Sequence, residues 1–242
     1  AGNPLFLKVA LDEILSTGMA VGQMATSVSR LFEQILDRLE KAYAPEIIAT
    51  CLGIIAAGRS GVAEQELLDI LKISHAGGDD LLLAVTRSLA NFIIRRKQLL
   101  AFFHPEFERS IMMRLGKGEM RKYYRLLADY FHSQGRGYER ALSELPYLEL
   151  CAGRDENALR LLTDIDFLQA KTEAGMANSL AFDFHNALYH NEIGLSSSSE
   201  LDLAGIKVSK ETLRLLEKAL NLDLQFLRNH PDRLFQCLWN RC

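Results

Sequence analysis

Apolar residues recur every three to four positions along most of the chain, which is the period of an amphipathic helix. Near the N-terminus, Leu31, Ile35 and Leu39 follow one another at four-residue steps with charged side chains between them. Asn3 and Pro4 form a typical helix start, because asparagine caps a first turn and proline is favoured at the first helical position. The pattern predicts two helices, over residues 4–16 and 27–43.

Between residues 44 and 116 the pattern changes from helical to extended and back. Two helical segments are joined by the turn Arg59-Ser60-Gly61-Val62, and Asp79-Asp80 can cap a third. Two short apolar runs then flank the polar residues 95–98, which is typical of a β-hairpin. The predicted helices cover residues 45–58, 63–71, 79–92 and 106–115, and the hairpin covers 93–103. This order of elements indicates a winged helix.

From residue 117 to residue 242 the chain keeps the helical period and is punctuated by glycines. A run of serines introduces a flexible loop that we expect near residues 194–208. No self-similarity of 34 residues is visible, so a tetratricopeptide array is not supported. The predicted helices cover residues 119–133, 138–151, 156–164, 167–174, 176–193, 209–228 and 231–240. The expected fold is mainly α: a winged helix with a small β-hairpin, followed by an all-α helical domain.

Charge and composition restrict the possible functions. With 28 basic and 31 acidic side chains the formal net charge is −3, which argues against wholesale binding of phosphate backbones. No apolar run approaches the roughly 20 residues that span a bilayer and no signal peptide is visible, so we expect a cytoplasmic protein without a membrane segment. The chain lacks an initiator methionine and is expected to be a piece of a longer protein. Its cysteines form no Cys-x-x-Cys pair and are expected to be reduced thiols, with Cys51 in the core.

No catalytic motif is complete in this sequence. It lacks the phosphate-binding loop G-x-x-x-x-G-K-[ST], the dinucleotide turn G-x-G-x-x-G, the zinc motif H-E-x-x-H and the nucleophile elbow G-x-S-x-G. Its histidines show no metal-ligand spacing on a shared face. Glu139, Glu144 and Glu149 share a predicted helix with Arg140 and are expected to form a solvated face. We therefore expect that this chain is not an enzyme and has no metal site.

A winged helix can read DNA, and Arg95-Arg96-Lys97 in the wing could touch a phosphate backbone. The predicted recognition helix, however, opens with Asp79-Asp80 and carries Arg87 as its one cation among several leucines. Reading base edges requires polar and basic side chains on that helix. Specific DNA binding is therefore not expected.

Several short motifs occur in the order found in one family of signalling proteins. They are Gly2-Asn3-Pro4-Leu5-Phe6-Leu7-Lys8, Leu36-x-Arg38-Leu39-Glu40, Ala57-Gly58-Arg59-Ser60-Gly61-Val62-x-Glu64-x-Glu66-Leu67, Phe102-Phe103-His104, Glu144-Leu145-Pro146-Tyr147, Leu161-Leu162-Thr163-Asp164, Asp166-Phe167-Leu168-Gln169-Ala170-Lys171 and Pro231-x-x-Leu234-Phe235-Gln236. With these motifs nearly the whole chain resembles the C-terminal arm of STAND-class NTPases of the NACHT and apoptotic protease-activating-factor type. In that family the arm precedes WD40 or tetratricopeptide repeats.

The resemblance implies three domains: the end of helical domain one at 1–43, a winged-helix domain at 44–116 and a second helical domain at 117–242. It implies a regulatory and oligomerisation arm that couples the ADP or ATP state of a signal-transduction switch to a sensor-repeat region. The parent protein would bind ADP or ATP with Mg, whereas this chain alone would hold no cofactor. The implied partners are the upstream NTPase domain and the downstream repeat domain of the same chain, and further copies on activation.

Two residues match nucleotide contacts of that family. Pro4 corresponds to the proline of its G-x-P motif, which packs against adenine, and His104 to the winged-helix histidine that reaches the β-phosphate of ADP. His104 precedes a predicted helix N-terminus, where backbone N–H groups and the helix dipole favour an anion. This chain reads Phe-His-Pro where plant members read Met-His-Asp. From the residues alone, Pro4 is also explained as a plain helix start and His104 as a helix cap.

Two other functions stay open at the level of the sequence. One is a purely structural helical scaffold or protein-interaction module without nucleotide dependence. The other, which the charge pattern disfavours, is a winged-helix regulator that binds DNA.

Overall fold

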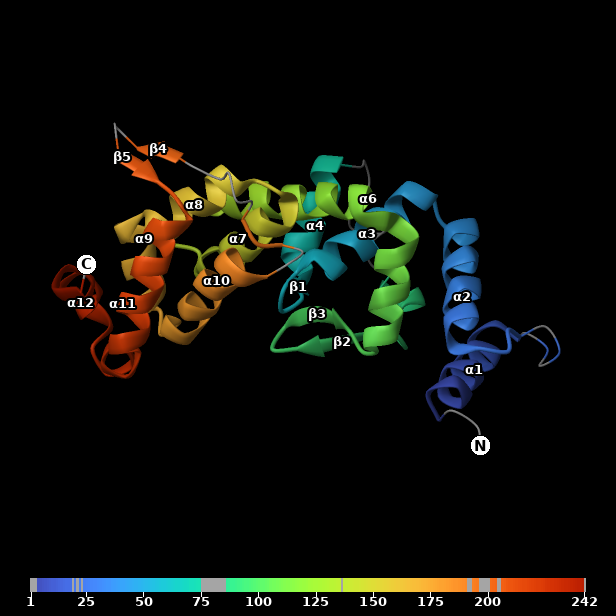
Figure 1. Cartoon of the computed structure of the whole chain (residues 1–242). Helices are drawn as coiled ribbons and strands as arrows, with labels where there is room; N and C mark the ends of the chain where they lie inside the picture. Colours follow the sequence, from blue (N-terminus) through green and yellow to red (C-terminus); the bar gives the residue numbers. More distant parts are fainter. Residues whose placement is uncertain are drawn as a thin grey trace. The chain divides into compact units, whose positions relative to one another are not determined.

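The structure is a computed structural model (Figure 1). It describes the chain except for residues 1–3, 19, 21, 23, 75–85, 136, 191–192, 196–200, 204–205 and 242. The chain divides into two compact units, Ala1–Tyr123 and Tyr124–Cys242, and each is described by itself. The mainly-α fold class is confirmed, and the finer division into three domains stays a prediction.

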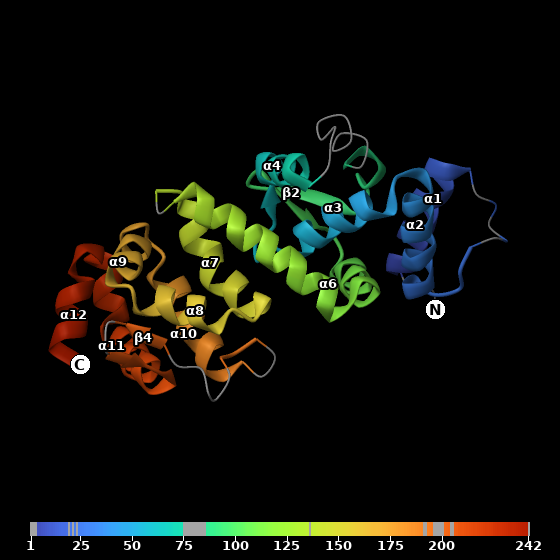
Figure 2. The same ribbon diagram turned by 90° about the horizontal axis from the view of Figure 1, so that it is seen from above.

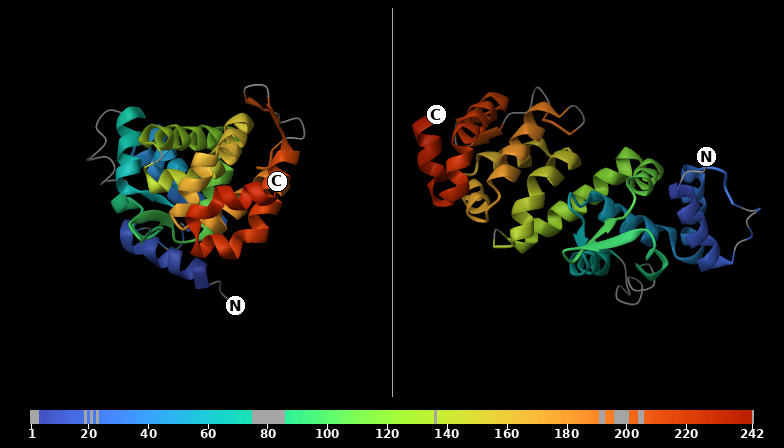
Figure 3. Two further views of the ribbon diagram at one scale, coloured as in Figure 1. Left: turned by 90° about the vertical axis from the view of Figure 1, so that its left-hand side faces the viewer. Right: turned by 90° about the horizontal axis from the view of Figure 1, so that it is seen from below.

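The first unit combines helices with a small sheet. Its helices are α1 (Pro4–Thr17), α2 (Val28–Ala42), α3 (Pro45–Ala57), α4 (Glu64–Ser74) and the first part of α6 (Pro105–Gln134), and its strands are β1 (Val62–Ala63), β2 (Ile93–Arg96) and β3 (Leu99–Phe102). All pairings are antiparallel, in the order β1-β3-β2. Figure 3 shows this sheet in green beside α3 and α4.

The predicted hairpin is confirmed, because Ile93 pairs with Phe102 and Arg96 with Leu99. The sequence interpretation missed β1, which pairs Val62 with Leu100 and extends the hairpin to three strands. A run of two residues carries too little periodicity to be recognised. The third predicted helix, with its cap at Asp79-Asp80, lies mostly outside the described residues. Of its described part, residues 86–88 are helical and 89–92 form a turn.

The turn between α3 and α4 requires glycine at position 61. Its φ of +97° lies in a region that side chains avoid, and a Cβ there would lie 2.5 Å from the carbonyl oxygen of Leu100. At Gly116 the backbone leaves the helical region with φ 75° and ψ 164°, so α6 consists of two helical segments across a kink (Figure 2). This is the break that separates the predicted helices 106–115 and 119–133.

Four phenylalanines form the centre of the first unit. The ring centroid of Phe107 lies 5.0 Å from Phe32, 4.7 Å from Phe92 and 5.6 Å from Phe102. Phe32 and Phe107 are fully buried. Because Phe32 comes from α2, Phe92 and Phe102 from the two sides of the hairpin and Phe107 from α6, this cluster joins α2 to the hairpin and α6.

Arg114 of α6 joins the same elements from the surface. Its guanidinium donates to Glu33 (2.7 Å), Asp37 (2.6 Å) and Glu40 (2.7 and 3.0 Å), which share one face of α2. The pKa of Arg114 is raised, first by the hydrogen bond to Glu40. No sequence motif pointed to Arg114, because its three partners lie more than 70 positions away.

The wing turn carries backbone strain that a double substitution should relieve. Lys97 and Gln98 have φ of 48° and 69°, and they form the two-residue loop between β2 and β3. Such turns favour Asn-Gly, because other side chains resist positive φ. We expect Lys97→Asn with Gln98→Gly to raise the free energy of unfolding by about 1 kcal/mol. Hydrogen exchange of β2 and β3 amides measures this, and Lys97→Val, with a β-branched side chain, should speed exchange.

The second unit is a helical array with a small hairpin. Its helices after α6 are α7 (Glu139–Ala152), α8 (Asp155–Thr163), α9 (Ile165–Glu173), α10 (Ala177–Tyr189), α11 (Lys210–Asn229) and α12 (Leu234–Arg241), with a short 3-10 turn η2 (Pro231–Arg233) before α12. These bounds agree with the predicted helices to within a few residues. Leucine and phenylalanine side chains from all of these helices form one core, which includes Phe167 and Phe184.

The expected loop near residues 194–208 contains a hairpin instead. Strand β4 (Leu201–Leu203) pairs antiparallel with β5 (Ile206–Val208), beside α8 and α11 (Figure 1). The alternation Leu-Asp-Leu and Ile-Lys-Val around Ala204-Gly205 is a hairpin signal, which the serine run before it obscured. The helical domain is therefore not entirely α.

A lysine and an aspartate are fully buried together in the second unit. Lys171 of α9 donates to Asp183 of α10 and, over 2.7 Å, to the carbonyl oxygen of Leu142 in α7. Both charged side chains are 0% exposed. The pair therefore connects three helices at the centre of the array.

The sequence predicts that three glutamates of α7 form a solvated face, and this prediction is wrong for two of them. Glu144 and Glu149 are buried, and only Glu139 is exposed. An Nη atom of Arg140 lies 3.5 Å from Glu144, and Nε2 of His132 lies 2.6 Å from Glu149. A buried carboxylate is tolerated when a basic partner compensates its charge. A partner on a neighbouring element, such as His132, cannot be recognised from the spacing of residues within one helix.

Candidate functional site

His104 lies at the start of α6, where the sequence placed a helix N-terminus. Its carbonyl oxygen accepts hydrogen bonds from the backbone N–H groups of Phe107 (3.0 Å) and Glu108 (3.3 Å). His104 is thus the N-cap residue through its backbone. The side chain is half-buried, and within the described part of the chain its ring nitrogens make no hydrogen bond. The side-chain cap that the sequence left open is not formed here.

Lys8 of α1 approaches the His104 segment from a distant part of the sequence. Its Nζ lies 4.4 Å from the ring centroid of Phe103, and that ring packs edge-on against His104 with centroids 4.4 Å apart. Partial burial, and then the charge of Lys8, lower the pKa of His104, against the opposing effect of Glu106 and Asp12. The imidazole is therefore protonated less readily than a free histidine, and its neutral form keeps one N–H donor.

Pro4 is the first residue of α1 and is exposed. Asn3, its predicted cap, lies outside the described residues. Lys8 is four positions after Pro4, one helical turn further along α1. The second turn of α1 therefore lies near His104, through the contact of Lys8 with Phe103. Among the described side chains, Pro4 and His104 make no direct contact. Sequence reasoning missed Lys8, which it quoted only as the last residue of the first motif.

Some of the charges around His104 would attract an anion and others would repel it. The dipole at the start of α6, the histidine N–H and Lys8 favour a negative group, whereas the N–H groups of Phe107 and Glu108 already donate to the carbonyl oxygen of His104. The same turn carries Glu106 and Glu108, which compensate the helix dipole. Burial raises the pKa of Glu108, so its carboxylate loses a proton less readily than an exposed one. The arrangement can donate hydrogen bonds to an anionic group that reaches His104.

The wing side chains are only partly available for binding. Arg95 forms an ion pair with Glu64 at 2.5 Å, while Arg96 and Lys97 are exposed. Among the described residues, no three His, Cys, Asp or Glu side chains are placed to hold a metal ion. Burial raises the pKa of Cys51 to about 12, which makes this core thiol unreactive at neutral pH.

None of the helices in the described residues combines the length and the apolar character needed to cross a bilayer. The long helices α6 and α11 both carry charged residues in every turn or nearly so.

Comparison with known proteins gives two partial similarities. The chain is 24% identical to human NACHT domain- and WD repeat-containing protein 1 in an alignment 280 residues long, and this alignment covers 91% of this chain and 17% of that protein. It is 27% identical to a TPR repeat-containing protein of Dictyostelium discoideum over 187 residues, which cover 67% of this chain and 10% of that protein. No protein-family model matches the chain, and no solved structure matches it significantly. The chain therefore resembles a segment of large repeat-containing proteins, and it spans less than a fifth of their length.

Proposed function

We propose that this chain is the regulatory and oligomerisation arm of a nucleotide-switched NTPase, which couples an ADP or ATP state to a repeat region of the same protein. The observation that carries the proposal is the position of the His104 side chain, which lies at the start of α6 with Lys8 close to the adjacent Phe103 ring. The similarity to a NACHT domain- and WD repeat-containing protein supports it.

In this proposal the chain provides one side of a nucleotide site. His104 donates its N–H to the β-phosphate of ADP, and Lys8 contributes positive charge at longer range. Pro4 offers an apolar ring to adenine at the start of the same helix as Lys8. A bound nucleotide with Mg would supply the phosphate charge and the phosphoryl chemistry. The phosphate-binding loop, which is absent from these 242 residues, would come from another part of the parent protein.

A second candidate function is a helical scaffold that mediates protein contacts without nucleotide dependence. Glu106 and Glu108 favour it, because carboxylates already occupy the anion-attracting end of α6. The exposed apolar side chains of α11 favour it as well. The two candidates differ in whether His104 affects nucleotide retention.

His104→Ala in the parent protein is expected to weaken ADP retention by about one to two orders of magnitude. A hydrogen bond to a charged group contributes about 1.5–3 kcal/mol, and its loss biases the switch toward the ADP-free, oligomeric state. Nucleotide content after purification, measured by chromatography, and the oligomeric state, measured by light scattering, check this result.

His230→Ala is the matched control for His104→Ala. His230 is an exposed histidine of the second unit, between the end of α11 and the short turn η2, where its ring packs on Phe226. Its replacement should leave ADP content unchanged. Equal ADP content in wild type and in both variants would reject the nucleotide role of His104 and would favour the scaffold.

A further inference from the structure

The ring of Phe103 contacts two groups that attract an anion. Nζ of Lys8 lies 4.4 Å from the ring centroid, and the imidazole of His104 packs against the same ring at an interplanar angle of 83°, with centroids 4.4 Å apart. Phe103 is 39% exposed, in contrast to the buried Phe102 beside it. The Phe103 ring therefore belongs to the surface around His104 and not to the core of the first unit.

Backbone hydrogen bonds fix the main chain of Phe103 and His104. The N–H of Phe103 donates to the carbonyl oxygen of Phe92 over 2.8 Å, next to the pairing of β2 and β3. The carbonyl oxygen of His104 accepts from Phe107 and Glu108 at the start of α6. Contacts between side chains then set the side-chain torsions. The direction of the imidazole therefore depends on the neighbouring Phe103 ring.

Helix α1 brings Lys8 to this ring. The next residue, Val9, is buried, so this turn of α1 is packed against the rest of the first unit. Further along α1, the buried Glu13 accepts two hydrogen bonds of 2.7 and 3.2 Å from Arg38 of α2. Helix α1 is therefore anchored within the first unit, which keeps Lys8 beside Phe103.

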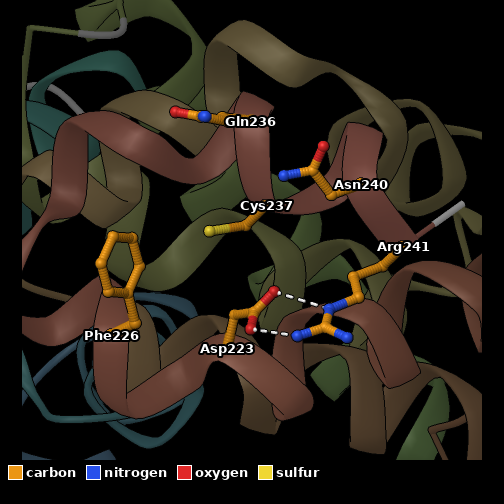
Figure 4. Close-up of a pocket in the computed structure, with 6 residues that line it drawn as sticks. All are labelled: Asp223, Phe226, Gln236, Cys237, Asn240 and Arg241. Carbon is orange, nitrogen blue, oxygen red and sulfur yellow. Dashed lines mark hydrogen bonds and ion pairs between the residues drawn. The ribbon is translucent and has the colours of Figure 1, made fainter.

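The charge of Lys8 is not cancelled by a carboxylate, because Lys8 forms no ion pair within the described part of the chain. Arg241 is a contrasting case, since it donates two hydrogen bonds of 3.1 and 3.0 Å to Asp223 in the groove between α11 and α12 (Figure 4). An anion that approaches Arg241 has to compete with that carboxylate. An anion that approaches Lys8 meets an ammonium held by an aromatic face, which attracts the cation and leaves its charge in place.

We propose that Phe103 is the positioning residue of the anion site at His104. Its ring holds the Lys8 ammonium and the imidazole close together, so that both can donate to one phosphate group. An aromatic ring suits this role because it binds a cation on its face and offers no oxygen that would compete with the phosphate. The inference rests on the proposed nucleotide role for the identity of the ligand, whereas the placement of Lys8 beside His104 is testable without a nucleotide.

Proton NMR of the whole chain follows the titration of His104, whose signal is the one of six histidine signals that His104→Gln removes. Partial burial and then the charge of Lys8 lower the pKa of His104, against the effects of Glu106 and Asp12. Lys8→Met should therefore raise this pKa, and Lys8→Arg, which keeps a cation for the ring, should stay close to wild type. Lys41→Met, at an exposed lysine of α2 in the same unit, is the matched control and should leave the titration unchanged.

A double-mutant cycle tests whether Phe103 holds Lys8 in place. Phe103→Leu removes the aromatic face, so Lys8 should leave the site and the pKa of His104 should rise. In the Phe103→Leu background, Lys8→Met should then have no further effect. Phe103→Tyr keeps the aromatic face and should titrate like wild type. Unchanged amide exchange of β2 and β3 in these variants shows that the hairpin is folded.

Two results would overturn the proposal: an unchanged titration of His104 in Lys8→Met, or effects of Lys8→Met and Phe103→Leu that add. In the parent protein, both variants should lower ADP retention by about three- to tenfold, because the donors lose their fixed positions. Additive effects, together with ADP retention that depends on His104, reject the role of Phe103 alone. The expected coupling, together with ADP retention that His104→Ala leaves unchanged, supports the positioning by Phe103 and rejects the nucleotide role.

Discussion

Asp183→Ala is expected to destabilise the second unit by about 3–5 kcal/mol. The substitution leaves the ammonium of Lys171 fully buried with the carbonyl oxygen of Leu142 as a remaining acceptor. A buried charge without a counter-charge loses its hydration and gains little in return, so the cost is larger than the usual effect of a point mutation. Lys171→Ala should have a similar effect, because it leaves the carboxylate of Asp183 buried.

The chain offers a specific probe for this measurement. Its one tryptophan, Trp239, lies in α12 of the second unit and is exposed. Urea unfolding followed through Trp239 should show a midpoint about 2–3 M lower for Asp183→Ala, if the slope is near 1.5 kcal/mol per molar urea. Amide exchange of α2 and α3 in the first unit should stay unchanged.

A double substitution separates the ion pair from its burial. Lys171→Met with Asp183→Leu replaces both charges by apolar side chains and should recover most of the stability that either single variant loses. If Asp183→Ala lowers the unfolding free energy by less than 1 kcal/mol, the pair is not buried as described. If the double variant is as unstable as Asp183→Ala, the charges themselves are needed to hold α7, α9 and α10 together.

Phe107→Ala is expected to destabilise the first unit by about 3–5 kcal/mol. The side chain is fully buried and contacts three other phenylalanine rings, so its removal leaves a cavity between α2, the hairpin and α6. Amide exchange of α3 and of β3 should become faster by a factor of more than 100, and Trp239 fluorescence should report an unchanged second unit.

Phe107→Leu and Phe235→Ala are the controls for that prediction. Phe107→Leu keeps most of the apolar volume and should cost less than half as much as the alanine variant. Phe235 is 57% exposed, so its replacement by alanine should change stability by less than about 0.5 kcal/mol. Equal effects of Phe107→Ala and Phe235→Ala would contradict the central position of Phe107.

The sequence by itself determined most of the helices and the wing hairpin. Helical periodicity and glycines such as Gly116 are local signals, because each depends on residues within one or two turns. The same reasoning placed His104 at a helix N-terminus. It found the wing from two apolar runs around residues 95–98, but not the two-residue strand β1 or the short hairpin β4–β5.

Only the tertiary structure decided the surroundings of the charged residues. Glu149 and Lys171 look like surface residues of amphipathic helices, yet each is buried because a partner on another helix, His132 or Asp183, meets it. Lys8 reaches the His104 segment although 96 positions separate the two residues, and Arg114 finds its carboxylates on α2. The energy of a buried charge depends on which elements surround it, and periodicity reports only which face of one element is apolar.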